Sequence, residues 1–239
     1  MRVLAAFLLA TLVLPAHASP YADAENLEQA FGIVFTARLS NNYLRMRCAQ
    51  WYPEMKSAID RHYYTWENTN ANEMAALDRL IESYSASYLA GFRTTSGIMI
   101  ATAFEEMASQ SPDRREFCDF AIDQMTGEFG IIRVTTPMAS TLLLEYLADN
   151  PLSELESHDR DSEIGCVKHG LNSGGDLDEL LAYCGCARDT MVNEMSEAER
   201  AEYYQTIMSD GASAARALPQ IQALGPKLER CSPEEPPDD

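Results

Sequence analysis

Four residues in the last third of the chain have the types and the spacing that redox or metal chemistry needs. Cys166 and His169 are separated by two residues, and Cys184 and Cys186, on either side of Gly185, follow after fourteen intervening residues. Thiolates and imidazoles are the usual zinc ligands, so these four side chains are a candidate metal site, although a one-residue gap departs from the commoner two-residue gap. The Cys-Gly-Cys segment could instead form a strained, easily reduced ring that suits thiol–disulfide exchange. A thiol-redox or metal-binding function is therefore the second hypothesis for this chain.

Residues 1–18 have the features of a secretory signal peptide. Arg2 gives a positive start, residues 3–14 form an almost unbroken apolar run, and the segment ends in Ala16-His17-Ala18, a small-x-small cleavage site. The apolar run has 12 residues, fewer than the about 20 that a membrane-spanning helix needs, so no stable membrane anchor is expected. We expect cleavage near Ala18 and a periplasmic or secreted location.

Export to an oxidising compartment favours structural disulfides over reactive thiols. The six cysteines of the exported part are Cys48, Cys118, Cys166, Cys184, Cys186 and Cys231. Cys184 and Cys186 fall on a predicted helix, where about 100° per residue points their side chains to opposite sides and prevents a bond between them. One should therefore pair with Cys166 and the other with Cys231, in an order that spacing leaves open, and Cys48 then pairs with Cys118.

Aromatic residues are dense between positions 51 and 88 and form the candidate binding surface. Those expected on it are Trp51, Tyr63, Trp66, Tyr84 and Tyr88. Tryptophan and tyrosine give a large contact area with a polar handle, although core packing is the alternative explanation. Arg93, followed by Thr94, Thr95 and Ser96, could add an anion site at the beginning of the next helix.

His62 is the candidate general base for a hydrolase, which is the third hypothesis. It falls on the same helix as Trp66, where a hydrogen-bonded core histidine is the alternative. The sequence contains no nucleophile elbow, metalloprotease helix, phosphate-binding loop or EF-hand. We therefore predict no catalytic residue and no cofactor.

The elements that must position these residues are predicted to be nearly all helices. Apolar residues recur in steps of three and four over 25–48, 53–66 and 70–88, and Asn70 with Glu73 resembles a helix-capping box. A break at Gly91–Gly97 should precede a helix over 98–107, and residues 129–134 alone have strand character. Further helices are expected over 136–150, 176–195 and 196–208, with Asp176 and Ser196 as caps.

These elements suggest an all-α fold with a helical bundle and a smaller module. The bundle, braced by one disulfide, should cover 19–150 and the four-cysteine helical module 164–231. Residues 151–163, rich in serine and acidic residues, are expected to be a linker, and 232–239 a disordered acidic tail.

The charge of the chain limits its partners. There are 37 acidic and 18 basic residues, giving a formal net charge of −19. This charge disfavours nucleic acid and anionic lipid surfaces, and a charged partner would be cationic. The leading hypothesis is a non-enzymatic exported protein that binds another protein or a small ligand.

Overall fold

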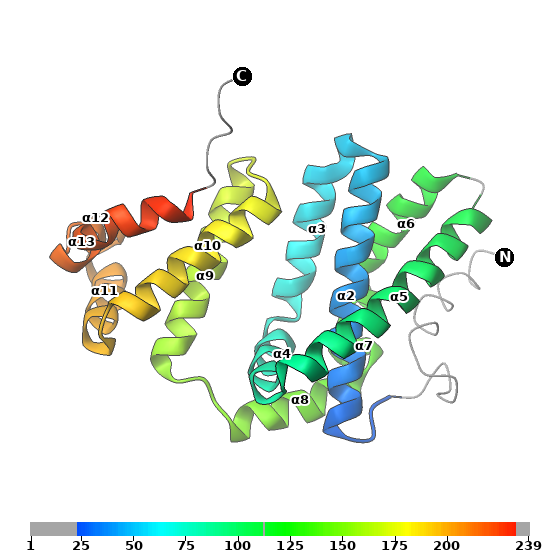
Figure 1. The fold of residues 1–239 in the computed structure, drawn as a ribbon, viewed down its shortest axis with the longest axis horizontal. Coiled ribbons are helices and arrows are strands. Elements are labelled where there is room, and N and C mark those ends of the chain that lie inside the picture. The colour runs from blue at the N-terminus through cyan, green and yellow to red at the C-terminus, as the bar shows by residue number, and fades with distance from the viewer. Residues whose placement is uncertain (1–22, 112, 233–239) are drawn as a thin grey trace. The chain divides into compact units, whose positions relative to one another are not determined.

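The computed structural model describes residues 23–111 and 113–232, which contain twelve α-helices, three 3₁₀ turns and no β-strand (Figure 1). The predicted all-α fold braced by disulfides is confirmed. The expected signal peptide, and the acidic tail beyond Ser232, lie outside the described residues. The chain divides into two compact units between Pro151 and Leu152.

The first unit is built around one long central helix. Its elements are α2 (Leu27–Trp51), η1 (Pro53–Met55), α3 (Lys56–Thr69), α4 (Ala71–Ser83), α5 (Ala86–Gln110), α6 (Arg114–Thr126), η2 (Glu128–Gly130), α7 (Ile132–Thr135) and α8 (Pro137–Asp149). Helices α3, α4, α5, α6 and α8 all pack against α2. A helix with neighbours on most sides buries a wide arc of its surface, and α2 accordingly buries Phe31, Val34, Phe35 and Leu44.

Helix α5 runs without a break through Gly91 and Gly97, so the interruption predicted there is wrong. A glycine inside a helix costs only about 1 kcal/mol relative to alanine, which packing can offset. The buried residues of α5, Ile100 among them, all lie in its second half. Its first half touches α2 through the Phe92 ring, whose centre is 5.4 Å from that of Phe35.

Asn70 connects distant segments, and the capping box predicted for it is wrong. Its side chain makes no cap hydrogen bond to α4. Instead Nδ2 donates to the carbonyl oxygens of Trp66 at 2.9 Å and Gly130 at 3.0 Å, and Oδ1 accepts from the Ile132 amide at 2.8 Å. The segment with strand character is therefore the turn η2 and the short helix α7, fixed to the end of α3.

The second unit consists of α9 (Glu154–Asn172), α10 (Leu177–Glu194), α11 (Glu197–Asp210), α12 (Ala212–Arg216), α13 (Pro219–Leu228) and η3 (Glu229–Cys231). Most of the segment expected as an acidic linker, residues 151–163, is the beginning of α9. Ser153 and Glu156 form a capping box there that composition alone concealed. The predicted caps Asp176 and Ser196 are confirmed.

All three disulfides join two elements of the same unit. Cys48–Cys118 links α2 to α6, with Cα atoms 5.8 Å apart. Cys166–Cys184 links α9 to α10, and Cys186–Cys231 links α10 to η3. The predicted pairing is confirmed, and the open order is settled, because on α10 Cys184 faces α9 and Cys186 faces η3.

Candidate binding site

The predicted aromatic residues lie in three separate groups. Tyr63 and Trp66 are buried in the core of the first unit, with 6% and 2% of their surface exposed. Tyr84, the residue directly after α4, stacks on Tyr88 of α5 with ring centres 4.8 Å apart, so the periodic pattern over residues 70–88 spans two helices rather than one. Trp51, at the end of α2, packs against Phe104 instead. Core packing accounts for Tyr63 and Trp66.

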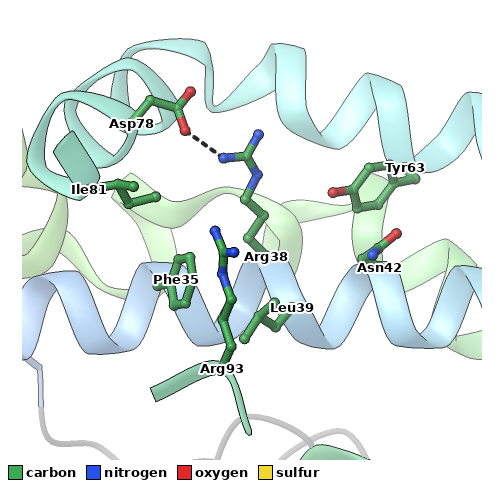
Figure 2. A pocket seen from close by; sticks show the side chains of 8 residues that line it. All are labelled: Phe35, Arg38, Leu39, Asn42, Tyr63, Asp78, Ile81 and Arg93. Carbon is green, nitrogen blue, oxygen red and sulfur yellow. Dashed lines mark hydrogen bonds and ion pairs between the residues drawn. The ribbon is translucent and has the colours of Figure 1, made fainter. Parts of the chain in front are cut away.

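A cavity of about 320 Å³ lies between α2, α3, α4 and α5 (Figure 2). Its lining residues are Phe35, Arg38, Leu39, Asn42, Tyr63, Asp78, Ile81 and Arg93. Two of them, Tyr63 and Arg93, were singled out in the sequence. The signal for the others is weak but present, because Phe35, Arg38 and Asn42 recur in steps of three and four along one face of α2.

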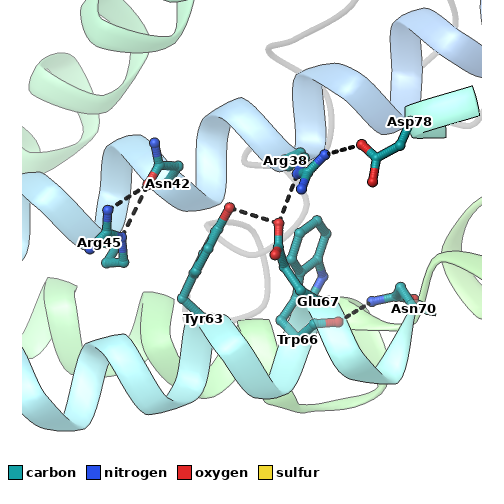
Figure 3. Close-up of polar contacts among 8 residues, drawn as sticks. All are labelled: Arg38, Asn42, Arg45, Tyr63, Trp66, Glu67, Asn70 and Asp78. Atoms are coloured by element: carbon teal, nitrogen blue, oxygen red, sulfur yellow. Dashed lines mark hydrogen bonds and ion pairs between the residues drawn. The ribbon is translucent and has the colours of Figure 1, made fainter. Parts of the chain in front are cut away.

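Arg38 is held in this pocket by carboxylates from two other helices (Figure 3). Its Nε donates to Glu67 of α3 at 2.7 Å, and its Nη1 donates to Asp78 of α4 at 2.6 Å. Burial alone would lower the pKa of Arg38, but the charges of these two carboxylates outweigh burial and raise it. The guanidinium therefore stays charged and is fixed in position.

Tyr63 supports the same arrangement from α3. Its hydroxyl donates to the Glu67 carboxylate at 2.9 Å. Burial, and then the negative charge of Glu67, raise the pKa of Tyr63, so its hydroxyl remains a donor in neutral solution. Glu67 thus accepts from both Tyr63 and Arg38, which fixes the carboxylate between α2 and α3.

Asn42 is oriented by a second polar network along α2 and α3. Its Oδ1 accepts from Nε and Nη2 of Arg45 at 3.0 and 2.9 Å (Figure 3). Arg45 also pairs with Asp60 at 3.1 Å, and both side chains are almost completely buried. Lys56 adds a further ion pair to Asp60 at 2.9 Å. With its oxygen engaged by Arg45, Asn42 keeps an amide nitrogen as a potential donor to the pocket.

Arg93 reaches the pocket from the exposed first half of α5. Figure 2 shows its guanidinium directed toward that of Arg38, beside the Phe35 ring. Its guanidinium carbon lies 5.7 Å from the centre of that ring. It makes no hydrogen bond or ion pair with another residue in 23–111 or 113–232. The predicted anion site at a helix beginning is wrong, because Arg93 and the following Thr94 lie inside α5.

The lining of the pocket combines hydrogen-bond donors with an apolar wall. Its lining contains hydrogen-bond donors on Arg38, Arg93 and Asn42 and an apolar wall, but no serine, threonine, cysteine or histidine. His62, the candidate general base, lies outside it. The only hydrogen-bond partner of His62 among the described residues is the Thr126 hydroxyl, 3.4 Å from Nδ1. That contact provides neither a carboxylate nor an activated nucleophile.

The cysteines of the candidate redox or metal site are all engaged in disulfides. Cys166, Cys184 and Cys186 therefore present no thiolate, and His169 is exposed on α9. Within the part of the chain that the structure describes, no group of three or more His, Cys, Asp or Glu side chains could hold a metal ion. The four residues do not form the predicted site in this state.

The second unit contains a buried polar cluster that the sequence did not indicate. Asp159 of α9 accepts a hydrogen bond from the Tyr204 hydroxyl at 2.7 Å and pairs with Arg200. Burial, and then Asp159, raise the pKa of Tyr204. The His158 ring packs on Tyr204 with centres 5.2 Å apart. Asp159 lies in a run of charged residues typical of a solvated segment, which concealed its role in joining α9 to α11.

No described helix combines the length and apolar character needed to cross a bilayer. Comparison of the chain with protein-family models, curated proteins and solved structures found no match.

Proposed function

We propose that this chain is an exported, non-enzymatic binding module whose first unit holds a small organic ligand in the α2–α5 pocket. The proposal rests on one observation. Arg38 and Arg93, from different helices, both line one cavity that also has an apolar wall (Figure 2). Small-molecule sites typically combine a concave apolar surface with a few convergent polar groups.

The charges around the pocket support a ligand in that position. Basic residues are scarce in this chain, at 18 against 37 acidic, and Arg47, Arg79 and Arg115 of the first unit each form an ion pair with a carboxylate. Arg93 has no such contact among the described residues, and it lines the same cavity as Arg38 (Figure 2). Glu67 and Asp78 already neutralise Arg38, so Arg93 is the cation of the pocket that a ligand with acceptors could engage.

The nature of the proposed partner differs from the sequence-based expectation. The net charge favoured a cationic partner, whereas a pocket rich in donors favours a ligand that carries acceptors. Of the predicted aromatic residues only Tyr63 lines the pocket, and Tyr63 and Trp66 are both part of the core. A thiol-redox or metal-binding role gains no support from six cysteines that are all engaged in disulfides.

A fragment screen by ligand-observed NMR tests the proposal with the mature protein. Arg93→Gln should abolish binding of pocket ligands, and so should Ile81→Trp, which fills the cavity without changing its charge. Arg61→Gln is the matched control, because Arg61 is an exposed arginine of α3 that does not line the pocket. The proposal fails if the wild-type protein binds no fragment, or if every binder is unaffected by both pocket variants.

A further inference from the structure

The geometry points to a class of ligand for this pocket: a small monocarboxylate whose apolar body lies against Phe35, Leu39 and Ile81. The inference rests on the proposed function and adds the chemistry of the bound molecule to it. Its carboxylate would lie against the Arg93 guanidinium, in the cavity that Arg38 also lines.

The donors available in the pocket match a carboxylate. Arg38 commits Nε and Nη1 to the ion pairs with Glu67 and Asp78, while its Nη2 enters neither pair. Arg93 commits no donor to any described residue. A guanidinium presents N–H groups in a planar fork that fits the two oxygens of a carboxylate, and such charge-assisted hydrogen bonds are roughly twice as strong as neutral ones.

The charges around the pocket limit the ligand to one negative charge. Arg38 and Arg93 contribute two positive charges, and Glu67 and Asp78, which hold Arg38, contribute two negative ones. These four charges sum to zero, and a single carboxylate can approach them from the side of Arg93. A second negative charge, as on a phosphate monoester, would be repelled by the Asp78 carboxylate, which is half exposed beside the same cavity.

The apolar wall requires a hydrophobic body on the same molecule. Phe35 is almost fully buried, with 3% of its surface exposed, and its ring is fixed by the rings of Phe31 and Phe92. Leu39 and Ile81 are half-buried and line the cavity beside it. Covering this surface removes apolar area from water, which contributes about 25 cal/mol per Å². Free inorganic anions would leave this contribution unused.

Three probes of equal length test the inference: hexanoate, hexanamide and hexylamine. Affinities are measured by calorimetry for the wild-type protein and for Arg93→Gln, Arg93→Lys and Arg61→Gln. We expect the wild-type protein and Arg61→Gln to bind hexanoate about tenfold more tightly than hexanamide, since hydrogen bonds to charged groups are the stronger ones. Arg93→Gln should remove this preference, and Arg93→Lys should restore part of it.

The location of binding is checked by hydrogen exchange. Hexanoate should slow amide exchange in the first half of α5, which has no buried residue. Equal binding of hexanoate and hexanamide, or tighter binding of hexylamine, would overturn the carboxylate assignment, yet the proposed function would stand if Ile81→Trp abolished that binding. If none of the probes and no fragment of the wider screen binds, the proposed function itself is wrong.

Discussion

Replacing Asn70 by alanine should severely destabilise the first unit. The Asn70 side chain is fully buried and connects the end of α3 to Gly130 and Ile132, which are also buried. The variant leaves the Gly130 carbonyl and the Ile132 amide without their side-chain partner. The Trp66 carbonyl loses less, because it also accepts from the Asn70 backbone amide at 3.2 Å. Each unsatisfied buried group costs about 1–3 kcal/mol, so the free energy of unfolding should fall by about 2–6 kcal/mol.

Tryptophan fluorescence during urea unfolding isolates this effect. Both tryptophans of the chain, Trp51 and Trp66, belong to the first unit, so the second unit contributes no tryptophan signal. Asn68→Ala is the control, because Asn68 is exposed on the last turn of the same helix. If Asn70→Ala lowers the free energy of unfolding by less than about 1 kcal/mol, water or a backbone shift satisfies both groups and the reasoning is refuted.

Two further predictions concern the disulfides and the response to alkaline pH. Under limiting reductant, the partly exposed Cys186–Cys231 bridge should be reduced before the fully buried Cys48–Cys118 bridge. Alkylation of the freed thiols followed by peptide mass spectrometry gives the order, and the reverse order would contradict the role of burial. Burial and a neighbouring carboxylate raise the pKa of Tyr63 above its ordinary 10, so the folded unit keeps a proton that the unfolded chain loses. The contribution of Tyr63 to the free energy of unfolding should therefore be full below pH 10 and decrease above it. Urea unfolding at pH values on both sides of 10 should show a smaller decrease for Tyr63→Phe than for the wild-type protein. An equal decrease for both proteins would exclude this role of Tyr63.

Local signals in the sequence were reliable where the interaction itself is local. Asp176 caps α10, and Ser196 caps α11, through hydrogen bonds to amides two or three residues away. Asn70 has the same appearance in the sequence, but its partners Gly130 and Ile132 are 60 and 62 residues away. A cap and a long-range connector can therefore share one pattern, and only the tertiary fold distinguishes them.

For the disulfides, too, the sequence predicted the local feature but not the one that depends on tertiary packing. The angle between Cys184 and Cys186 follows from helix geometry, so the sequence was sufficient to exclude a bond between them. Their order depends on which side of α10 faces α9, and that is decided by packing rather than by spacing.

The pocket could be predicted only in fragments. Arg93 was chosen as an anion ligand for the beginning of a helix, which it does not occupy. Its proximity to Arg38, 55 positions earlier in the sequence, follows from the packing of α5 across α2. Nothing in the pattern of either helix indicates that these two side chains line one cavity, because the aromatic contact between the helices is made by Phe92 and the rings around it.

No cystine spans the division between Pro151 and Leu152. The covalent cross-links of each half close entirely within that half, so oxidative maturation of one does not depend on synthesis of the other. A protease that cut the connecting segment would leave no covalent bond between the two halves, and each would retain its own bridges. In evolution, either half could be duplicated, exchanged or lost without leaving an orphan thiol in the remainder.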